Sequence, residues 1–76
     1  MLTNKEKRNI EHEMIRIIYN YNKGINTRSL ISLAYKNLHS SIPNANRHHF
    51  SGMIAWLLKA YNFHLIIRTP GYSVIQ

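Results

Sequence analysis

The stretch NRHHFSGMIAWLLKAYNFHLIIRTPGYSVIQ, residues 46–76, changes from the hydrophobic period of a helix to that of a strand. Up to Tyr61 the apolar residues recur every three or four positions, which predicts a helix from about 45 to 61. The apolar face of this helix is formed by Phe50, Met53, Ile54, Leu57, Leu58 and Tyr61. Asn62 tolerates the left-handed conformation that often ends a helix, so we expect an extended segment after it.

The segment from about 64 to 76 is predicted to form a β-hairpin. Its first strand is His64–Arg68 and its return strand is Tyr72–Gln76. Between the strands, Pro70 and Gly71 occupy the two central positions that favour a type II turn.

A helix from about 4 to 22 is predicted near the start of the chain. Thr3 and Glu6 stand at the spacing of a capping box, which marks the beginning of this helix. Gly24 is expected to end it as a left-handed cap. Its apolar stripe consists of Ile10, Met14, Ile17, Ile18 and Tyr21.

A second helix is predicted from about 27 to 38. Either Asn26 or Thr27 can cap it, because both side chains accept hydrogen bonds from free backbone N–H groups. A break follows, because Pro43 forces Ile42 away from helical geometry. The buried stripe of this helix is expected to be Leu30, Leu33, Ala34 and Leu38.

The order helix, helix, helix, hairpin resembles the winged-helix family of DNA-binding domains. In the resemblance, Asn26–Leu38 is the supporting helix, Asn46–Tyr61 is the recognition helix, and Leu65–Ile75 is the wing. The link from Ser40 to Asn44 is longer than the tight turn of the simple helix-turn-helix. The resemblance lies in the pattern of elements and identifies no subfamily. We therefore expect one domain over 1–76, mainly α with a small C-terminal β-hairpin, as a three-helix winged helix-turn-helix.

Acidic residues are confined to the beginning of the chain. The 76 residues contain Glu6, Glu11 and Glu13 but no Asp, and the formal net charge is +7. Most general acids, general bases and metal sites use a carboxylate, so we do not expect an enzyme. A small cationic domain is instead typical of proteins that bind a polyanion, most often nucleic acid.

Cofactor and metal sites are not expected either. There is no Cys, which excludes disulfides and thiolate–zinc sites and favours a cytoplasmic protein. His48 and His49 are adjacent, so on a helix their side chains should point about 100° apart. The longest apolar run, Met53–Leu58, is far shorter than the roughly 20 residues that span a bilayer. Frequent Asn, Ile, Lys and Tyr have AT-rich codons, which are common in viruses and mobile elements.

The face of the third helix opposite its apolar stripe has the composition of a DNA-reading surface. Arg can read guanine, Asn can read adenine, and Ser can bind a phosphate or a base edge. Recognition concentrates in the N-terminal half of such a helix. The residues predicted to read bases are Asn46, Arg47, His48 and Ser51.

A second set of cations is predicted to contact phosphates. Arg28 belongs to the first turn of the second helix, where backbone N–H groups also attract phosphate. The full set is Arg28, Lys36, Lys59 and Arg68. The predicted function is thus a small sequence-specific duplex-DNA-binding protein that regulates transcription.

Other interpretations of these residues stay open. The polar face of the third helix is also what an ordinary solvated helix presents. The alternative function is a winged-helix module that binds and modulates a host protein, which exposure of Met53 with Trp56 as one patch would favour. Trp56 can instead pack against the first helix or the wing. Gly52 has two interpretations, tight helix packing or room for a DNA backbone. Candidate contacts with a second copy or a partner are Ile15, Tyr19, Met53 and Trp56.

Binding of RNA or single strands is a third alternative. It would use Tyr35, Tyr61 and Tyr72, which are too scattered in the sequence to predict a stacking platform.

Overall fold

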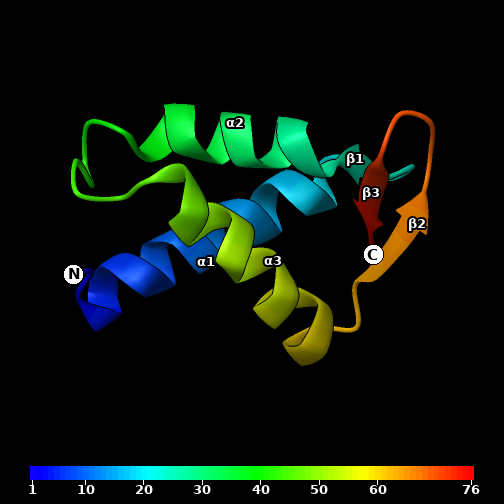
Figure 1. Cartoon of the computed structure of the whole chain (residues 1–76). Helices are drawn as coiled ribbons and strands as arrows, with labels where there is room; N and C mark the ends of the chain where they lie inside the picture. The colour runs from blue at the N-terminus through cyan, green and yellow to red at the C-terminus, as the bar shows by residue number, and fades with distance from the viewer.

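The computed structural model describes residues 1–76. The helices are α1 (Asn4–Tyr19), α2 (Thr27–Leu38) and α3 (Arg47–Ala60), and the strands are β1 (Ile25–Asn26), β2 (His64–Ile67) and β3 (Tyr72–Ile75). Each helix packs against the other two, and the small antiparallel sheet stands at one end of the helices (Figure 1). The chain is therefore mainly α, and its order of elements is consistent with a winged-helix-like fold, as expected.

The sheet has three strands in the order β1-β3-β2. The predicted hairpin is present as β2 and β3, with Leu65 opposite Val74 and Ile67 opposite Tyr72. On the other side of β3, Ile25 of β1 also pairs with Val74. The strand β1 was not predicted, because two residues are too short to show an alternating pattern and their partner lies far away in the sequence.

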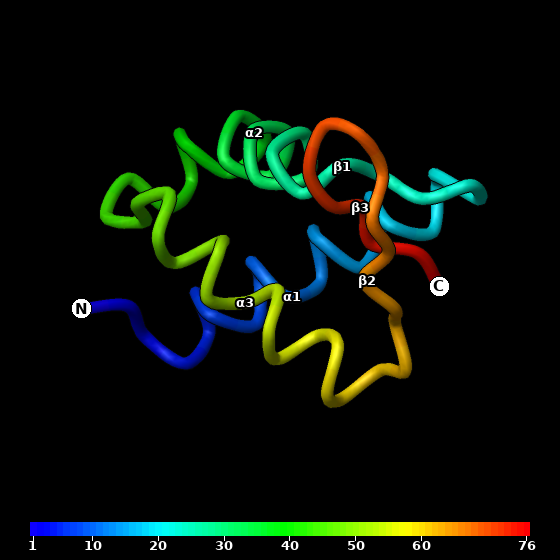
Figure 2. Tube along the Cα trace, turned by 45° about the vertical axis from the view of Figure 1, so that its right-hand side comes forward, coloured from blue at the N-terminus to red at the C-terminus, as the bar shows by residue number.

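The hairpin turn lies beside the beginning of α2 (Figures 1 and 2). The Asn26 side-chain amide donates a hydrogen bond of 3.2 Å to the Pro70 carbonyl and so fastens the turn to this helix. Gly71 has a φ of +87°, as its turn position requires. The Thr69–Pro70 peptide bond is cis, a geometry that the type II prediction did not include.

The first helix ends earlier than predicted. α1 stops at Tyr19 with Asn20 as its C-cap, so the prediction of Gly24 as that cap is wrong. Gly24 has a φ of +96° in the loop before β1, where a Cβ would lie only 3.3 Å from the Val74 carbonyl oxygen. Gly24 thus lets the chain turn closely along β3. Tyr21 lies in this loop and is exposed, so it is not part of the buried stripe of α1.

Local sequence signals predicted the caps at the other helix ends. Thr3 and Glu6 form the predicted capping box, with hydrogen bonds of 3.1 and 2.9 Å between each side chain and the other residue's N–H. Asn26 caps α2 by accepting from the Arg28 N–H at 2.9 Å. Asn62 has a φ of +58°, the left-handed conformation expected after α3.

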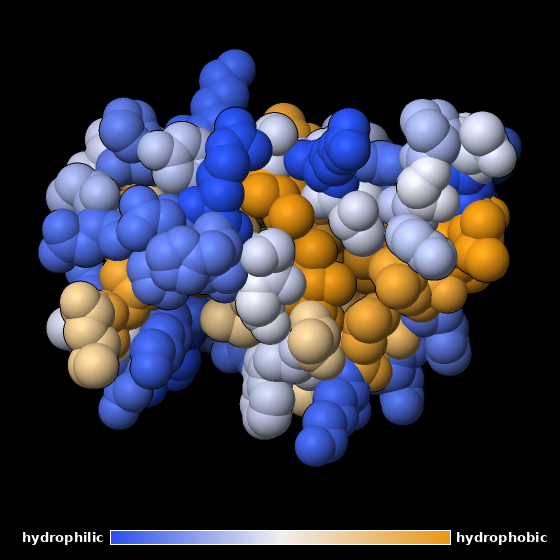
Figure 3. Space-filling view, in the orientation of Figure 1, coloured by the Kyte–Doolittle hydropathy of each residue, from blue (hydrophilic) through white to orange (hydrophobic).

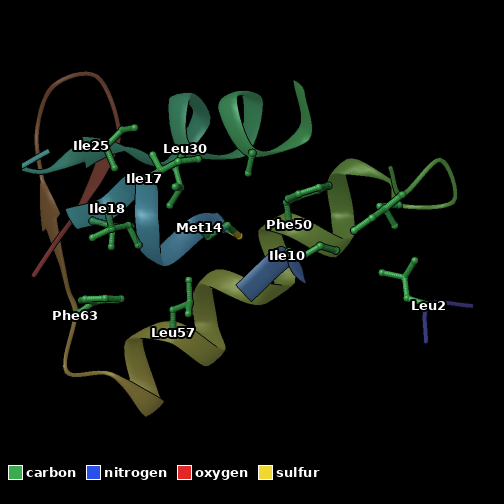
Figure 4. Close-up of a cluster of buried hydrophobic side chains, with 14 residues drawn as sticks. Leu2, Ile10, Met14, Ile17, Ile18, Ile25, Leu30, Phe50, Leu57 and Phe63 are labelled. Carbon is green, nitrogen blue, oxygen red and sulfur yellow. The ribbon is translucent and has the colours of Figure 1, made fainter. Parts of the chain in front are cut away.

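One apolar core joins the three helices to the sheet (Figure 4). Predicted core residues Met14, Leu30 and Phe50 are almost completely buried and point into the same interior from three different helices. The unpredicted members Ile42 and Ala45 come from the link between α2 and α3. Their burial anchors this long link. Half-buried residues of the predicted stripes are Leu33, Leu38, Met53, Ile54 and Leu58, whereas Tyr61 is exposed.

Glu13 connects α1 to α2. Its carboxylate pairs with Arg16 on the same helix and accepts a hydrogen bond of 2.7 Å from the Asn37 amide on α2. The hydrogen bond from Arg16 is the main cause that holds the pKa of Glu13 below its ordinary value, although partial burial opposes the shift. The ionised form of Glu13 therefore stabilises the folded state.

Replacing Glu13 by Gln should lower the free energy of unfolding at pH 7 by about 0.5–1 kcal/mol. Because the folded-state pKa is lowered, the contribution is complete above the unfolded pKa and is lost as the pH falls through the folded value. The difference between wild type and Glu13→Gln should therefore shrink as the solution is acidified. Urea unfolding followed by circular dichroism at several pH values measures this difference. A constant difference at every pH would show that the charge of Glu13 is irrelevant.

Candidate nucleic-acid interface

The four predicted base-reading residues are all exposed at the beginning of α3. Asn46 precedes the helix in an extended conformation, and its backbone N–H donates to Nδ1 of His49 at 2.9 Å. Burial of Phe50 and Leu57 fixes the opposite side of α3 in the core. The first turns of α3 therefore present Asn46, Arg47, His48 and Ser51 to solvent, as the sequence predicts.

A shallow cleft of about 520 Å³ lies between α2 and α3. Three of the predicted base-reading residues line it from α3, together with the predicted phosphate contact Arg28 from α2. The lining residues are Arg28, Ile31, Ser32, Arg47, His48 and Ser51. The fold thus brings side chains from two predicted sets, about twenty residues apart in the sequence, to one surface. Asn46 stands outside this lining.

Arg47 is held against α2. One guanidinium nitrogen donates to the Ser32 hydroxyl at 3.3 Å, and the guanidinium carbon lies 5.3 Å from the centre of the Tyr35 ring. These contacts fix the direction of the side chain while leaving it exposed. The residues predicted to contact duplex DNA did not include Ser32 or Tyr35, although Ser32 stands one helical turn after Arg28 on α2.

The other two cleft residues of α3 have local hydrogen bonds. The Ser51 hydroxyl donates to the His48 carbonyl at 3.1 Å, so its lone pairs remain available to accept. The rings of His48 and His49 lie side by side, with 4.2 Å between their centres, although the two side chains were predicted to leave the helix about 100° apart. The physical reason is the bond from the Asn46 N–H to His49, which draws the His49 ring back toward the start of the helix. No cluster of three or more His, Cys, Asp or Glu residues is present.

The predicted phosphate contacts differ in whether their side chains already bond to other parts of the protein. Lys36 on α2 and Lys59 on α3 are exposed and make no hydrogen bond or ion pair with another side chain. Arg28 lines the cleft and also a second hollow, which the start of α2 forms with the hairpin turn. Arg68 is exposed, but one of its guanidinium nitrogens donates to the Lys23 carbonyl beside Gly24. Arg68 therefore fastens the hairpin to the loop before β1.

Positive charge is almost uncompensated in the folded chain. Ten Lys and Arg residues share a single ion pair, Arg16–Glu13, so nine cations have no carboxylate partner. All three side-chain carboxylates are on α1, and each already has hydrogen-bond partners. Glu6 bonds within its capping box, Glu13 bonds Arg16 and Asn37, and Glu11 bonds Trp56 and Tyr61. No carboxylate belongs to α2, α3 or the hairpin.

Hydrophobic surface lies between α3 and the hairpin, whereas hydrophilic surface covers α2 and the link into α3 (Figure 3). Leu65, Ile67 and Tyr72 are exposed and share one face of the hairpin, because Ile67 and Tyr72 are register partners. The sequence prediction gave this hairpin a cationic role only. The run Leu65-Ile66-Ile67 was the available signal, since a short exposed strand seldom has three consecutive apolar residues.

The candidate partner contacts do not form one patch. Tyr19 is exposed but packs edge-on against Phe63, with 5.8 Å between ring centres. Ile15 and Met53 are half-buried against the core. Trp56 is 53% exposed and packs on α1, where its indole N–H donates to Glu11 at 2.8 Å. Of these four, Met53 and Trp56 line one groove, which lies between α1 and α3.

No model of a known protein family, no curated protein and no solved structure matches this chain. None of the helices combines the length and the apolar composition needed to cross a bilayer.

Proposed function

We propose that the protein is a winged-helix domain that binds duplex DNA in a sequence-specific manner and acts as a small transcription regulator. The observation that carries the proposal is the meeting of Arg28, Arg47, His48 and Ser51 at one exposed cleft on two helices that lack any carboxylate. A surface of this kind attracts a polyanion and offers hydrogen-bond donors to it.

In this proposal α3 enters the major groove, which is wide enough to admit a helix. The side of α3 with Ser51 and Ala55 is exposed and has small side chains, so the helix can approach base edges closely. Arg47 can donate two hydrogen bonds to a guanine through nitrogens not used by Ser32. Contact with Ser32 and Tyr35 holds the Arg47 side chain in one direction before binding, which reduces the entropy lost in the complex.

Phosphates would be held on both sides of α3. Arg28 stands at the N-terminus of the twelve-residue helix α2, where the helix dipole and the backbone N–H groups also favour an anion. Lys36 lies in the last turn of α2 and Lys59 in the last turn of α3. On the hairpin, Ile67 and Tyr72 would add apolar contact with sugars or base edges.

The decisive experiment compares Arg47→Ala with Lys59→Ala on a duplex selected from a random pool. Arg47→Ala should cost about 1–3 kcal/mol and relax specificity at one base position, because a base contact is lost. Lys59→Ala should weaken all sequences alike, because a phosphate contact carries no sequence information. Fluorescence anisotropy with the selected duplex and with a scrambled one measures both effects.

Arg8→Ala is the matched control, since Arg8 is an exposed arginine on α1 that lines the groove on another side of α3. It should leave both affinities nearly unchanged. Equal losses across sequences for Arg47→Ala and Lys59→Ala would refute α3 as the recognition helix. Absence of any duplex binding at low salt would refute the proposal as a whole.

A further inference from the structure

The groove between α1 and α3 is a hollow of about 440 Å³. The buried residues Leu2 and Ile10 line it on one side, and the half-buried Met53 and the exposed Trp56 line it on the other. The remaining lining residues are Asn4, Lys7, Arg8, Glu11, His49 and Gly52. No α3 residue of this hollow, hereafter the α1–α3 groove, belongs to the cleft between α2 and α3. The two sites therefore occupy different sides of α3.

Trp56 is fixed in the groove wall with about half of its surface exposed to solvent. Its indole N–H and the Tyr61 hydroxyl donate to the same Glu11 oxygen, at 2.8 and 2.9 Å. The bond to Glu11 raises the pKa of Tyr61, because loss of its proton would place two negative charges together. An aromatic ring that is held in one position but left half-exposed is typical of residues that anchor a binding partner.

Gly52 leaves an opening in the same wall. A Cβ at this position would meet no atom within 4 Å. Tight helix packing therefore does not require glycine here, and the packing interpretation of Gly52 is wrong. Gly52 also has an ordinary helical φ, so no left-handed conformation requires it. Glycine in the interior of a helix destabilises the fold relative to alanine. The open space therefore points to something outside the chain that approaches the backbone of α3 closely.

Charge indicates the chemistry of this occupant. Lys7 and Arg8 are exposed in the groove lining and have no carboxylate partner, while the single carboxylate, Glu11, is engaged by Trp56 and Tyr61. A second copy of the chain would bring another +7 charge and no free acidic segment. Charge complementarity thus favours an acidic partner over self-association.

We infer that the α1–α3 groove docks an acidic peptide segment of a partner protein. One large apolar side chain of the peptide lies against Trp56 and Met53. The peptide backbone passes over Gly52, and its carboxylates pair with Lys7 and Arg8. This docking does not depend on DNA binding, because it uses other residues of α3.

Selection of random-sequence peptides on the immobilised full chain tests the inference. Enriched peptides should combine Asp or Glu with Leu, Phe or Trp. Because Trp56 is the only tryptophan, its emission should change when a synthetic enriched peptide that itself lacks Trp is titrated into the protein. Failure to enrich any acidic peptide would overturn the inference.

Gly52→Leu separates binding from folding. The substitution replaces glycine by a good helix former in open space, so the melting temperature should rise. Its side chain fills the path of the peptide backbone, so peptide affinity should fall roughly tenfold or more. A stabilised variant with weaker binding cannot be explained by damage to the fold. Unchanged peptide affinity in this variant would overturn the inference.

Reversing the charges of Lys7 and Arg8 tests their role in peptide binding. The double variant Lys7→Glu with Arg8→Glu should lower peptide affinity roughly tenfold or more, whereas Lys36→Glu on α2 should change it by less than about twofold. Arg47→Ala should also leave peptide binding unchanged, so failure of this inference is distinguishable from failure of DNA binding. A last comparison uses phosphatidylserine–phosphatidylcholine vesicles. If the protein binds them more strongly than it binds the peptide, and if this binding also depends on Lys7 and Arg8, the groove binds lipid and the inference is overturned.

Discussion

Raising the salt concentration from about 50 to about 200 mM should weaken duplex DNA binding by about 150-fold. Each phosphate that a Lys or Arg neutralises releases a counterion, so the logarithm of affinity falls linearly with the logarithm of salt concentration. The cations predicted to contact phosphates are Arg28, Lys36, Lys59 and Arg68, all of them exposed. Four contacts give a slope of about −3.6.

A double variant checks which cations produce the slope. Lys36→Gln with Lys59→Gln removes two exposed lysines that have no partner in the folded chain. The slope should become shallower by about 2, and the fold should be unaffected because neither side chain contributes to the core. Anisotropy titrations of a labelled duplex at several salt concentrations measure the slope. A slope that does not change in the variant would show that DNA binds elsewhere on the protein.

Replacing Phe50 by Ala should lower the free energy of unfolding by about 3–5 kcal/mol. Phe50 is only 1% exposed, and its ring meets Tyr35 edge-on with 5.9 Å between ring centres. The lost side chain leaves a cavity where α3 packs on α2. A domain of this size has a total stability of only about 4–11 kcal/mol, so this one substitution should remove between about a quarter and all of it.

Urea unfolding followed by circular dichroism measures this loss. Ala55→Ser is the matched control on the same helix, since Ala55 is exposed and its replacement should change stability by less than about 0.5 kcal/mol. DNA binding by Phe50→Ala should weaken as well, because Tyr35 supports both Phe50 and Arg47. A variant with wild-type stability would contradict the central place of Phe50 in the core.

Much of the fold could be predicted because its signals are local. The capping box of Thr3 and Glu6, the cap at Asn26 and the left-handed Asn62 all depend on neighbours within a few residues. The hydrophobic period likewise identified the stripe of each helix. Local signals failed at the end of α1, where Gly24 has the expected positive φ but serves the approach to β3 instead of the helix terminus.

Part of the candidate site could be predicted for the same reason. Exposure of Arg47, His48 and Ser51 follows from their place opposite Phe50 and Leu57 on one helix. Their meeting with Arg28 at one cleft was not predicted, because it depends on how α2 packs against α3. Contacts of Arg47 with Ser32 and Tyr35, or of Arg68 with Lys23, were not predictable, because they join side chains on different elements.

Residue order alone established where the helices start, which of their faces are apolar, and that no acidic side chain follows Glu13. The tertiary structure decided the other features, through the way the helices cross and the register of the strands. It pairs β1 with β3, places Trp56 on Glu11, and separates the cleft between α2 and α3 from the α1–α3 groove. The physical reason is the distance along the chain over which each kind of signal acts. Caps and hydrophobic periods act over a few residues, whereas these contacts join residues far apart in the sequence, such as Ile25 and Val74, which are 49 positions apart.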